Sequence, residues 1–139
     1  MIRAVIDTSV LIRYLLKPSA AIRELIENRW LGDELQMVTT PDLIVELEDV
    51  LKRDYIQALI RPEEGEAILV AITLRADILP PLGPVPAYTR DPKDDKFVAC
   101  ALIGGADYII SEDKDLLVLA VVGNVQIMTP YDFMHTTPQ

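Results

Sequence analysis

The sequence predicts an α/β fold in which a central, mainly parallel sheet lies between layers of helices. Two observations predict it. Short runs of successive apolar residues, typical of strands covered on both faces, alternate with longer segments whose apolar residues recur at helical spacing. Strands joined through helices form right-handed crossovers, which make neighbouring strands parallel. The length of 139 residues fits a single domain that spans residues 1–139.

The first half of the chain begins with a short apolar run that ends at Asp7. Further on, Thr40-Pro41 supplies an N-cap residue and a proline at the first position of a helix. A later helix begins at Pro62 and has acidic residues in its first turn, where the helix dipole favours them. In order, the sequence predicts a strand at 3–6, helices at 10–16 and 20–30, a strand at 36–39, and helices at 41–51 and 62–75.

The second half contains a proline-rich stretch, residues 80–92, which we expect to be an ordered loop within the same core. Asp91-Pro92 begins the next helix, and Gly104-Gly105 ends it, as glycines commonly do at helix C-termini. The remaining predicted elements are a brief strand at 78–79, a helix through residue 103, a strand at 108–110, a short helix at 113–119 and a last strand at 125–128.

Composition restricts the class of protein. The chain has 13 Lys and Arg against 22 Asp and Glu, a formal net charge of −9, which argues against a general nucleic-acid coat protein but not against a nuclease. No apolar stretch approaches the roughly 20 residues that span a bilayer, so we expect no membrane association. The single cysteine, Cys100, cannot form an internal disulfide, and this favours a cytoplasmic protein.

Acidic residues follow the two most distinct strands. Asp7 ends the first strand and Asp113 follows the strand at 108–110. The carboxyl ends of parallel strands are where sites form in such sheets, so these two carboxylates converge if the strands are neighbours. Asp94 and Glu46 are candidates for the same crevice. Carboxylates that cluster without histidine or cysteine suit Mg²⁺ or Mn²⁺ rather than zinc.

Each acid also has a structural interpretation. Asp7 can cap the following helix, and Asp91 can cap the helix that Pro92 begins, with Asp94 favourable to its dipole. Ser111 can cap the turn that contains Asp113. Glu46 and Glu48 lie on opposite flanks of the apolar stripe of their helix, and periodicity does not choose between them.

Four motifs taken together resemble a known family. They are Val5-Ile6-Asp7-Thr8-Ser9-Val10, Thr40-Pro41-x-Leu43-Ile44-x-Glu46, Asp91-Pro92-Lys93-Asp94-Asp95-Lys96-Phe97 and Ile110-Ser111-Glu112-Asp113-Lys114-Asp115-Leu116-Leu117. In this order they resemble the PIN-domain ribonucleases, most of all the VapC-like toxins of toxin–antitoxin pairs. The resemblance covers nearly the whole chain and implies a Rossmann-like three-layer α/β/α sandwich and metal-dependent cleavage of RNA.

The resemblance also implies roles for individual residues. The four catalytic acids would be Asp7, Glu46, Asp94 and Asp113, of which Asp7, Asp94 and Asp113 would hold Mg²⁺ or Mn²⁺. Ser9, Asp91, Ser111 and Asp115 would be accessory residues. As partners we expect an RNA substrate, a homodimer or higher oligomer, and a small antitoxin protein that occupies an apolar groove near the first helices and obstructs the metal cleft.

Other readings of the sequence remain. A phosphatase of the aspartyl-phosphate type usually has a second aspartate where Ser9 stands, which disfavours that class. A binding module, either a receiver-like domain or a catalytically inactive PIN-like domain that docks a partner, is the main alternative. Lys93, Lys96 and Lys114 lie beside the acidic motifs and either contact flanking phosphates or are solvated, and Arg13 and Lys17 form a second possible basic edge.

Overall fold

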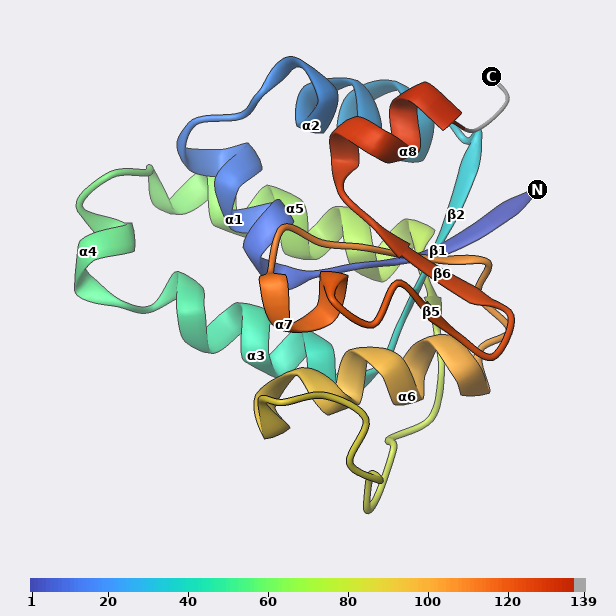
Figure 1. The fold of residues 1–139 in the computed structure, drawn as a ribbon. Coiled ribbons are helices and arrows are strands. Elements are labelled where there is room, and N and C mark those ends of the chain that lie inside the picture. Colours follow the sequence, from blue (N-terminus) through green and yellow to red (C-terminus); the bar gives the residue numbers. More distant parts are fainter. Residues whose placement is uncertain (137–139) are drawn as a thin grey trace.

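The centre of the computed structural model, which describes residues 1–136, is a six-stranded sheet in the order β3-β2-β1-β4-β6-β5 (Figure 1). The strands are β1 (Ile2–Ile6), β2 (Leu35–Thr39), β3 (Asp77–Ile78), β4 (Tyr108–Ile110), β5 (Val121–Val122) and β6 (Val125–Met128). Every pairing is parallel except that of β5 with β6. β1 and β4 are direct neighbours, with Ile6 opposite Ile110, so the residues that follow them lie at one edge of the sheet.

Helices cover both faces of this sheet. They are α1 (Thr8–Leu16), α2 (Ala20–Glu24), the π-helix η1 (Leu25–Trp30), α3 (Pro41–Leu51), α4 (Asp54–Gln57), α5 (Pro62–Arg75), the 3₁₀ turn η2 (Pro92–Asp94), α6 (Asp95–Ile103), α7 (Lys114–Leu117) and α8 (Pro130–Thr136). Figure 1 shows α1, α2, α5 and α8 on one side of the strands and α6 on the other. Within residues 1–136, no helix combines the length and apolar character that crossing a membrane requires.

The two faces of the sheet bury two separate cores, and the pleat of β1 divides its side chains between them. Ala4 and Ile6 belong to the core that contains Trp30 and Phe133, whereas Val5 belongs to the core beneath α6. Alternation of this kind is what a strand covered on both faces requires, because successive side chains point to opposite sides. The expected α/β sandwich with a mainly parallel sheet is therefore confirmed.

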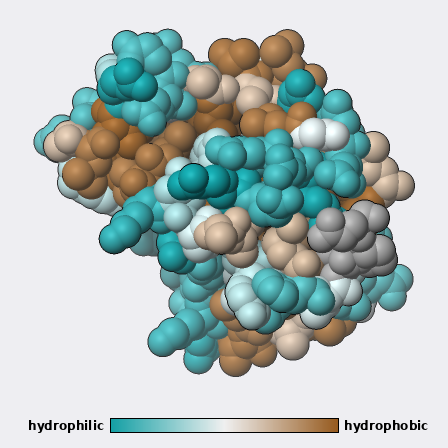
Figure 2. Space-filling model, turned by 90° about the horizontal axis from the view of Figure 1, so that it is seen from above, coloured by the Kyte–Doolittle hydropathy of each residue, from teal (hydrophilic) through white to brown (hydrophobic). Residues whose placement is uncertain are grey.

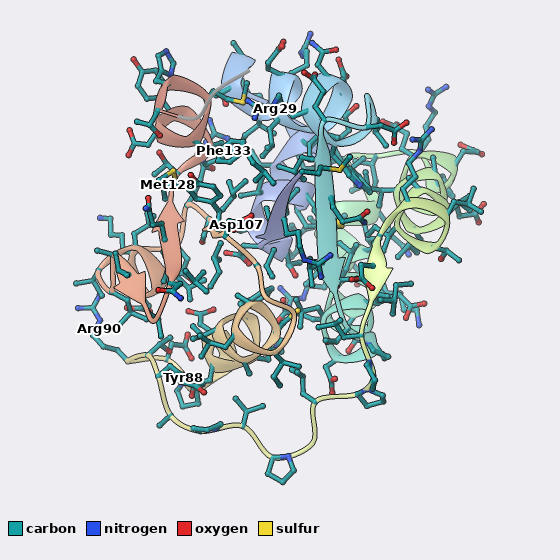
Figure 3. The ribbon with its side chains drawn as sticks, turned by 90° about the vertical axis from the view of Figure 1, so that its right-hand side faces the viewer. Arg29, Tyr88, Arg90, Asp107, Met128 and Phe133 are labelled. Carbon is teal, nitrogen blue, oxygen red and sulfur yellow. The ribbon has the colours of Figure 1, made fainter. Side chains whose placement is uncertain are left out.

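The structure differs from the sequence prediction at short elements. The helix expected over 20–30 is present, but its second half, Leu25–Trp30, has π geometry. α4, β5 and α8 were not predicted, because segments of two to seven residues carry too little periodicity to be recognised. α8 is fixed by tertiary contacts: Phe133 is fully buried and packs against Arg29 of η1, with the guanidinium 5.0 Å from the ring centre (Figure 3).

The proline-rich loop is held by side chains from two helices. Asp42 of α3 accepts a hydrogen bond from the backbone N–H of Leu82 at 3.0 Å. Asp95, at the start of α6, accepts the backbone N–H groups of Tyr88 and Thr89 at 2.9 and 2.8 Å, and Figure 3 shows Tyr88 beside that helix. These bonds fix the chain on both sides of Pro84 and place the segment that leads into η2.

Candidate metal centre

Asp7 lies at the carboxyl end of β1, where it also begins α1. Its backbone N–H continues the sheet to the carbonyl of Ile110, and its carboxylate accepts the backbone N–H of Ser9, which makes it the N-cap predicted from the sequence. Two hydroxyls also donate to this carboxylate, Ser9 at 2.9 Å and Ser111 at 2.6 Å. Burial raises the pKa of Asp7, and the hydrogen bonds from Ser111 and Ser9 partly oppose that rise.

The end of β4 supplies the second acid through a turn built on Ser111. This serine is fully buried, and its hydroxyl oxygen accepts the backbone N–H of Asp113 at 2.9 Å. Asp113 in turn caps α7 by accepting the backbone N–H of Asp115 at 2.8 Å. Asp113 is therefore both a helix cap and a residue of the cleft, because one of its carboxylate oxygens caps α7 while the side chain still lines the cleft.

Glu46 reaches the same place from α3. The hydroxyl of Thr8 donates to its Oε2 at 2.6 Å, and the ammonium of Lys96 lies 2.6 Å from its Oε1. The structure thereby chooses Glu46 over Glu48, which lines a different hollow between α3 and α5. Thr8 was not among the site residues expected from the sequence. The one signal for it was its position, because a residue that directly follows the acid at the end of a parallel strand lies at the same edge of the sheet.

Asp94 is the least compensated acid of the group. It is 7% exposed, and its Oδ2 is buried with no hydrogen-bond partner among the described residues. Burial raises the pKa of Asp94 to about 7, helped by the negative charge of Asp113, by a hydrogen bond between the Asp94 and Asp113 side chains, and then by the negative charges of Asp7 and Asp91. A carboxylate in this position is costly unless a proton or a cation neutralises it.

Asp94 and Asp95 are adjacent in the sequence but face different partners. Asp94 lines the cleft, whereas Asp95 turns to the proline-rich loop and accepts its two backbone N–H groups. Those hydrogen bonds lower the pKa of Asp95, so it stays ionised as a structural acceptor. The two side chains have different surroundings because the 3₁₀ turn η2 ends at Asp94 and α6 begins at Asp95.

A second grouping of acids shares Asp94. One carboxylate oxygen each from Asp91, Asp94 and Asp115 lie within 4.8 Å of one another. Asp91 caps η2 by accepting the backbone N–H of Lys93, and Asp115 forms an ion pair with Arg90 at 2.8 Å. Asp91 and Asp115 therefore each have a partner outside the trio, whereas the buried Oδ2 of Asp94 accepts no hydrogen bond from the described residues.

These side chains border a cleft of about 830 Å³. Of the residues predicted from the sequence, Asp7, Ser9, Glu46, Asp91, Asp94 and Asp113 line it; Ser111 lies behind Asp7, and Asp115 is reached through Asp94. The cations expected nearby divide into two sets. Lys17 and Lys93 line the cleft without a carboxylate partner among the described residues. Lys96 and Arg13 have such partners: Lys96 pairs with Glu46, and Arg13, which also lines the cleft, contacts Glu112 at 2.6 and 2.7 Å.

The residues present fit a hard divalent cation. The Oδ2 of Asp94 is buried with no hydrogen-bond partner among the described residues, and the cleft that Asp94 lines holds several carboxylates and hydroxyls but, within those residues, no histidine or cysteine. Oxygen-only sites of this kind suit Mg²⁺ or Mn²⁺. Asp91, Asp94 and Asp115 are the trio that brings ligand oxygens within 4.8 Å of one another among the described residues, whereas Asp7 and Asp113, expected from the sequence to hold the ion with Asp94, line the same cleft.

Comparisons with known proteins identify the fold and the family of this chain. The fold is similar to a chain in the crystal structure of VapBC2 from Rickettsia felis bound to a DNA fragment from their promoter, with a TM-score of 0.57 and 12% sequence identity over 91% of this chain and 97% of that one. No curated protein sequence matches. The sequence model described as PIN domain matches residues 3–115. Because this match covers most of the sequence, the chain belongs to the PIN domain family.

Proposed function

We propose that this protein is a divalent-metal-dependent ribonuclease whose ion is held by Asp7, Asp94 and Asp113, with Glu46 as the fourth catalytic acid. One observation carries the proposal. The buried Oδ2 of Asp94 lacks a hydrogen-bond donor within residues 1–136 although three other carboxylates raise its pKa. A cation at this point would neutralise the cluster and turn an unfavourable arrangement into a binding site.

Bound Mg²⁺ or Mn²⁺ would supply two things, a lower pKa for an attacking water and stabilisation of charge on the phosphate. The chain's own residues prepare the site for that chemistry. Ser9 and Ser111 hold the Asp7 carboxylate in one orientation, and Thr8 and Lys96 do the same for Glu46. Glu46 would bind the ion directly or through a water, and the cap of α7 fixes Asp113.

The biological setting belongs to the same proposal. The fold-level similarity to a VapBC2 chain and the resemblance of the four motifs to VapC-like proteins support a toxin with a small antitoxin partner. Ile12 and Leu16 of α1 give one wall of the cleft an apolar surface that such a partner would cover. Purification of the chain together with the product of the neighbouring gene tests this, and the mass of the purified protein in solution tests the proposed homodimer.

The experiment that tests the activity compares isosteric variants. Purified wild type should cleave RNA in Mg²⁺ or Mn²⁺ and not in EDTA. Asp7→Asn, Asp94→Asn and Asp113→Asn should each lose at least about a hundredfold in rate, since each removes a charge from the proposed ion site. Asp132→Asn, an exposed acid of α8, is the matched control and also reveals any contaminating nuclease.

One further variant, Asp115→Asn, decides which acids accompany Asp94. If Asp113 is the ligand, Asp115→Asn should reduce the rate far less than Asp113→Asn. The reverse order would assign the ion to Asp91, Asp94 and Asp115 instead. If wild type and Asp7→Asn are equally inactive on RNA under all metal conditions, the inactive docking module becomes the better description of this protein.

A further inference from the structure

The cleft contains cations that no carboxylate neutralises. Six ion pairs join side chains within residues 1–136, and they occupy Arg3, Arg13, Arg61, Arg75, Arg90 and Lys96. Lys17, Arg53 and Lys93 have no carboxylate partner among the described residues, and all three line the cleft. In a chain of net charge −9, cations that remain unpaired beside one cleft point to an anionic ligand there.

An exposed aromatic side chain stands beside one of these cations and lines the same cleft as the other two. Tyr55 of α4 lines the cleft and is 58% exposed, and its hydroxyl is 3.5 Å from the guanidinium of Arg53. Figure 1 shows α4 and α1 on the side of the molecule toward which β1 runs. Seen from above, apolar side chains gather on that same side (Figure 2). Leu16, the last residue of α1, is exposed and also lines the cleft.

We propose that Lys17, Arg53 and Tyr55 form a binding wall for single-stranded RNA next to the scissile phosphate. Tyr55 stacks on an unpaired base, and Lys17 and Arg53 bind the phosphates on either side of that base. The inference rests on the proposed ribonuclease function, because it names the part of the cleft that the substrate occupies beyond the acids.

The chemistry of the wall favours a single strand over other anionic ligands. An aromatic ring with flanking cations is the arrangement that binds unpaired nucleotides, since every base offers a face for stacking and every phosphate a charge. In a duplex the base faces are already stacked on one another, so Tyr55 would have no surface to contact. The wall is also continuous with the acids, as one cleft includes Asp7, Asp94 and Tyr55.

Fluorescence anisotropy with a labelled oligouridylate of roughly 12 nucleotides tests the stacking contact, because single-strand sites span about 4–16 nucleotides. EDTA is present so that the strand is not cleaved. Tyr55→Ala should weaken binding at least about fivefold, the lower range for one stacked base, and Tyr55→Phe should restore it. Tyr131→Ala, which removes a tyrosine of similar exposure on α8, is the matched control and should bind like the wild type.

The salt dependence of binding tests the two cations separately from the ring. Each phosphate contact contributes about 0.7 to the slope of log affinity against log salt for a single strand, so Lys17→Ala and Arg53→Ala should each lower the slope by about that amount. Lys52→Ala should not, because Lys52 lines the separate hollow between α3 and α5. Tyr55→Ala should leave the slope unchanged while it lowers affinity.

The outcomes separate this inference from the proposed activity. Two results together support the wall. The wild type binds the oligouridylate and Tyr55→Ala binds it more weakly by the stated factor. For the matching RNA duplex, Tyr55→Ala binds as the wild type does. Equal RNA binding by wild type and all three wall variants, or no binding by the wild type, overturns it and leaves the surface to a protein partner. Metal-dependent cleavage by wild type together with unchanged binding by the variants would overturn the wall alone.

Discussion

The hydroxyl of Ser111 donates a 2.6 Å hydrogen bond to the carboxylate of Asp7, which lies 104 residues earlier in the chain. The same hydroxyl oxygen accepts the backbone N–H of Asp113. One buried serine therefore fixes the distance between the acids at the ends of β1 and β4. It also stabilises the charged form of Asp7, which burial alone would disfavour.

Ser111→Ala should weaken both the fold and the site. The substitution leaves Asp7 with one hydroxyl donor instead of two, so we expect a loss of about 1.5–3 kcal/mol in the free energy of unfolding, the range for a hydrogen bond to a charged group. We also expect about tenfold weaker Mn²⁺ binding. Chemical denaturation and titration with Mn²⁺ measure the two effects. Thr73→Ala, which removes an exposed hydroxyl bonded to a carbonyl within α5, should change neither.

Lys96→Met should separate metal binding from turnover. The Lys96 ammonium lies 2.6 Å from Glu46 and competes with a cation for that carboxylate. Its removal leaves the cleft more negative, so Mn²⁺ should bind about twofold to fivefold more tightly, while the RNA cleavage rate falls because Glu46 loses its orientation. Lys96→Arg should recover the rate, and Lys114→Met is the control. Weaker Mn²⁺ binding in Lys96→Met would contradict this account.

The stability of the metal-free protein should fall as the pH rises. The pKa of the Asp94 carboxyl is raised from 3.8 to about 7 in the folded chain, so between these pH values the folded state binds more protons than the unfolded state. Stability then decreases with increasing pH across this interval. Asp94→Asn removes the effect and should raise the melting temperature at pH 8 in EDTA by about 3–6 °C, which corresponds to roughly 1–2 kcal/mol.

Addition of Mg²⁺ should reverse that pH dependence. A cation that binds the ionised acids stabilises the folded state most at pH 8, where Asp94 would otherwise be an uncompensated charge, and least at pH 5, where a proton occupies it. Differential scanning fluorimetry at both pH values measures the shift. An equal rise in melting temperature at pH 5 and pH 8, or a Mg²⁺ response retained in Asp94→Asn, would argue against Asp94 as a ligand.

Asp95→Ala should destabilise the protein without weakening metal binding, whereas Asp94→Asn should weaken metal binding. The substitution leaves the N–H groups of Tyr88 and Thr89 without their acceptor, each worth about 1 kcal/mol. The proline-rich loop should then be cleaved faster by a protease, which a timed digestion detects. Mn²⁺ affinity should stay within about twofold of wild type, and a larger loss would place Asp95 in the ion site.

Much of the framework could be predicted from the chain alone because its signals are local. Apolar runs marked β1 and β2, and the pair Thr40-Pro41 marked the start of α3, where the Thr40 hydroxyl accepts the backbone N–H of Leu43. Gly104-Gly105 likewise ends α6, with Gly105 at a φ of 61° that glycine adopts readily. What local patterns did not show was α4, whose four residues carry Tyr55 to the rim of the cleft.

The sequence by itself determined that strands and helices alternate, and therefore that acids at the ends of β1 and β4 share one edge of a parallel sheet. Only the tertiary structure separated neighbours of equal chemistry, since Asp94 and Glu46 line the cleft whereas Asp95 and Glu48 face other parts of the molecule. The physical reason is that a carboxylate's role depends on what surrounds it. Burial beside other negative charges raises the pKa of Asp94, while two backbone N–H groups make Asp95 a structural acceptor.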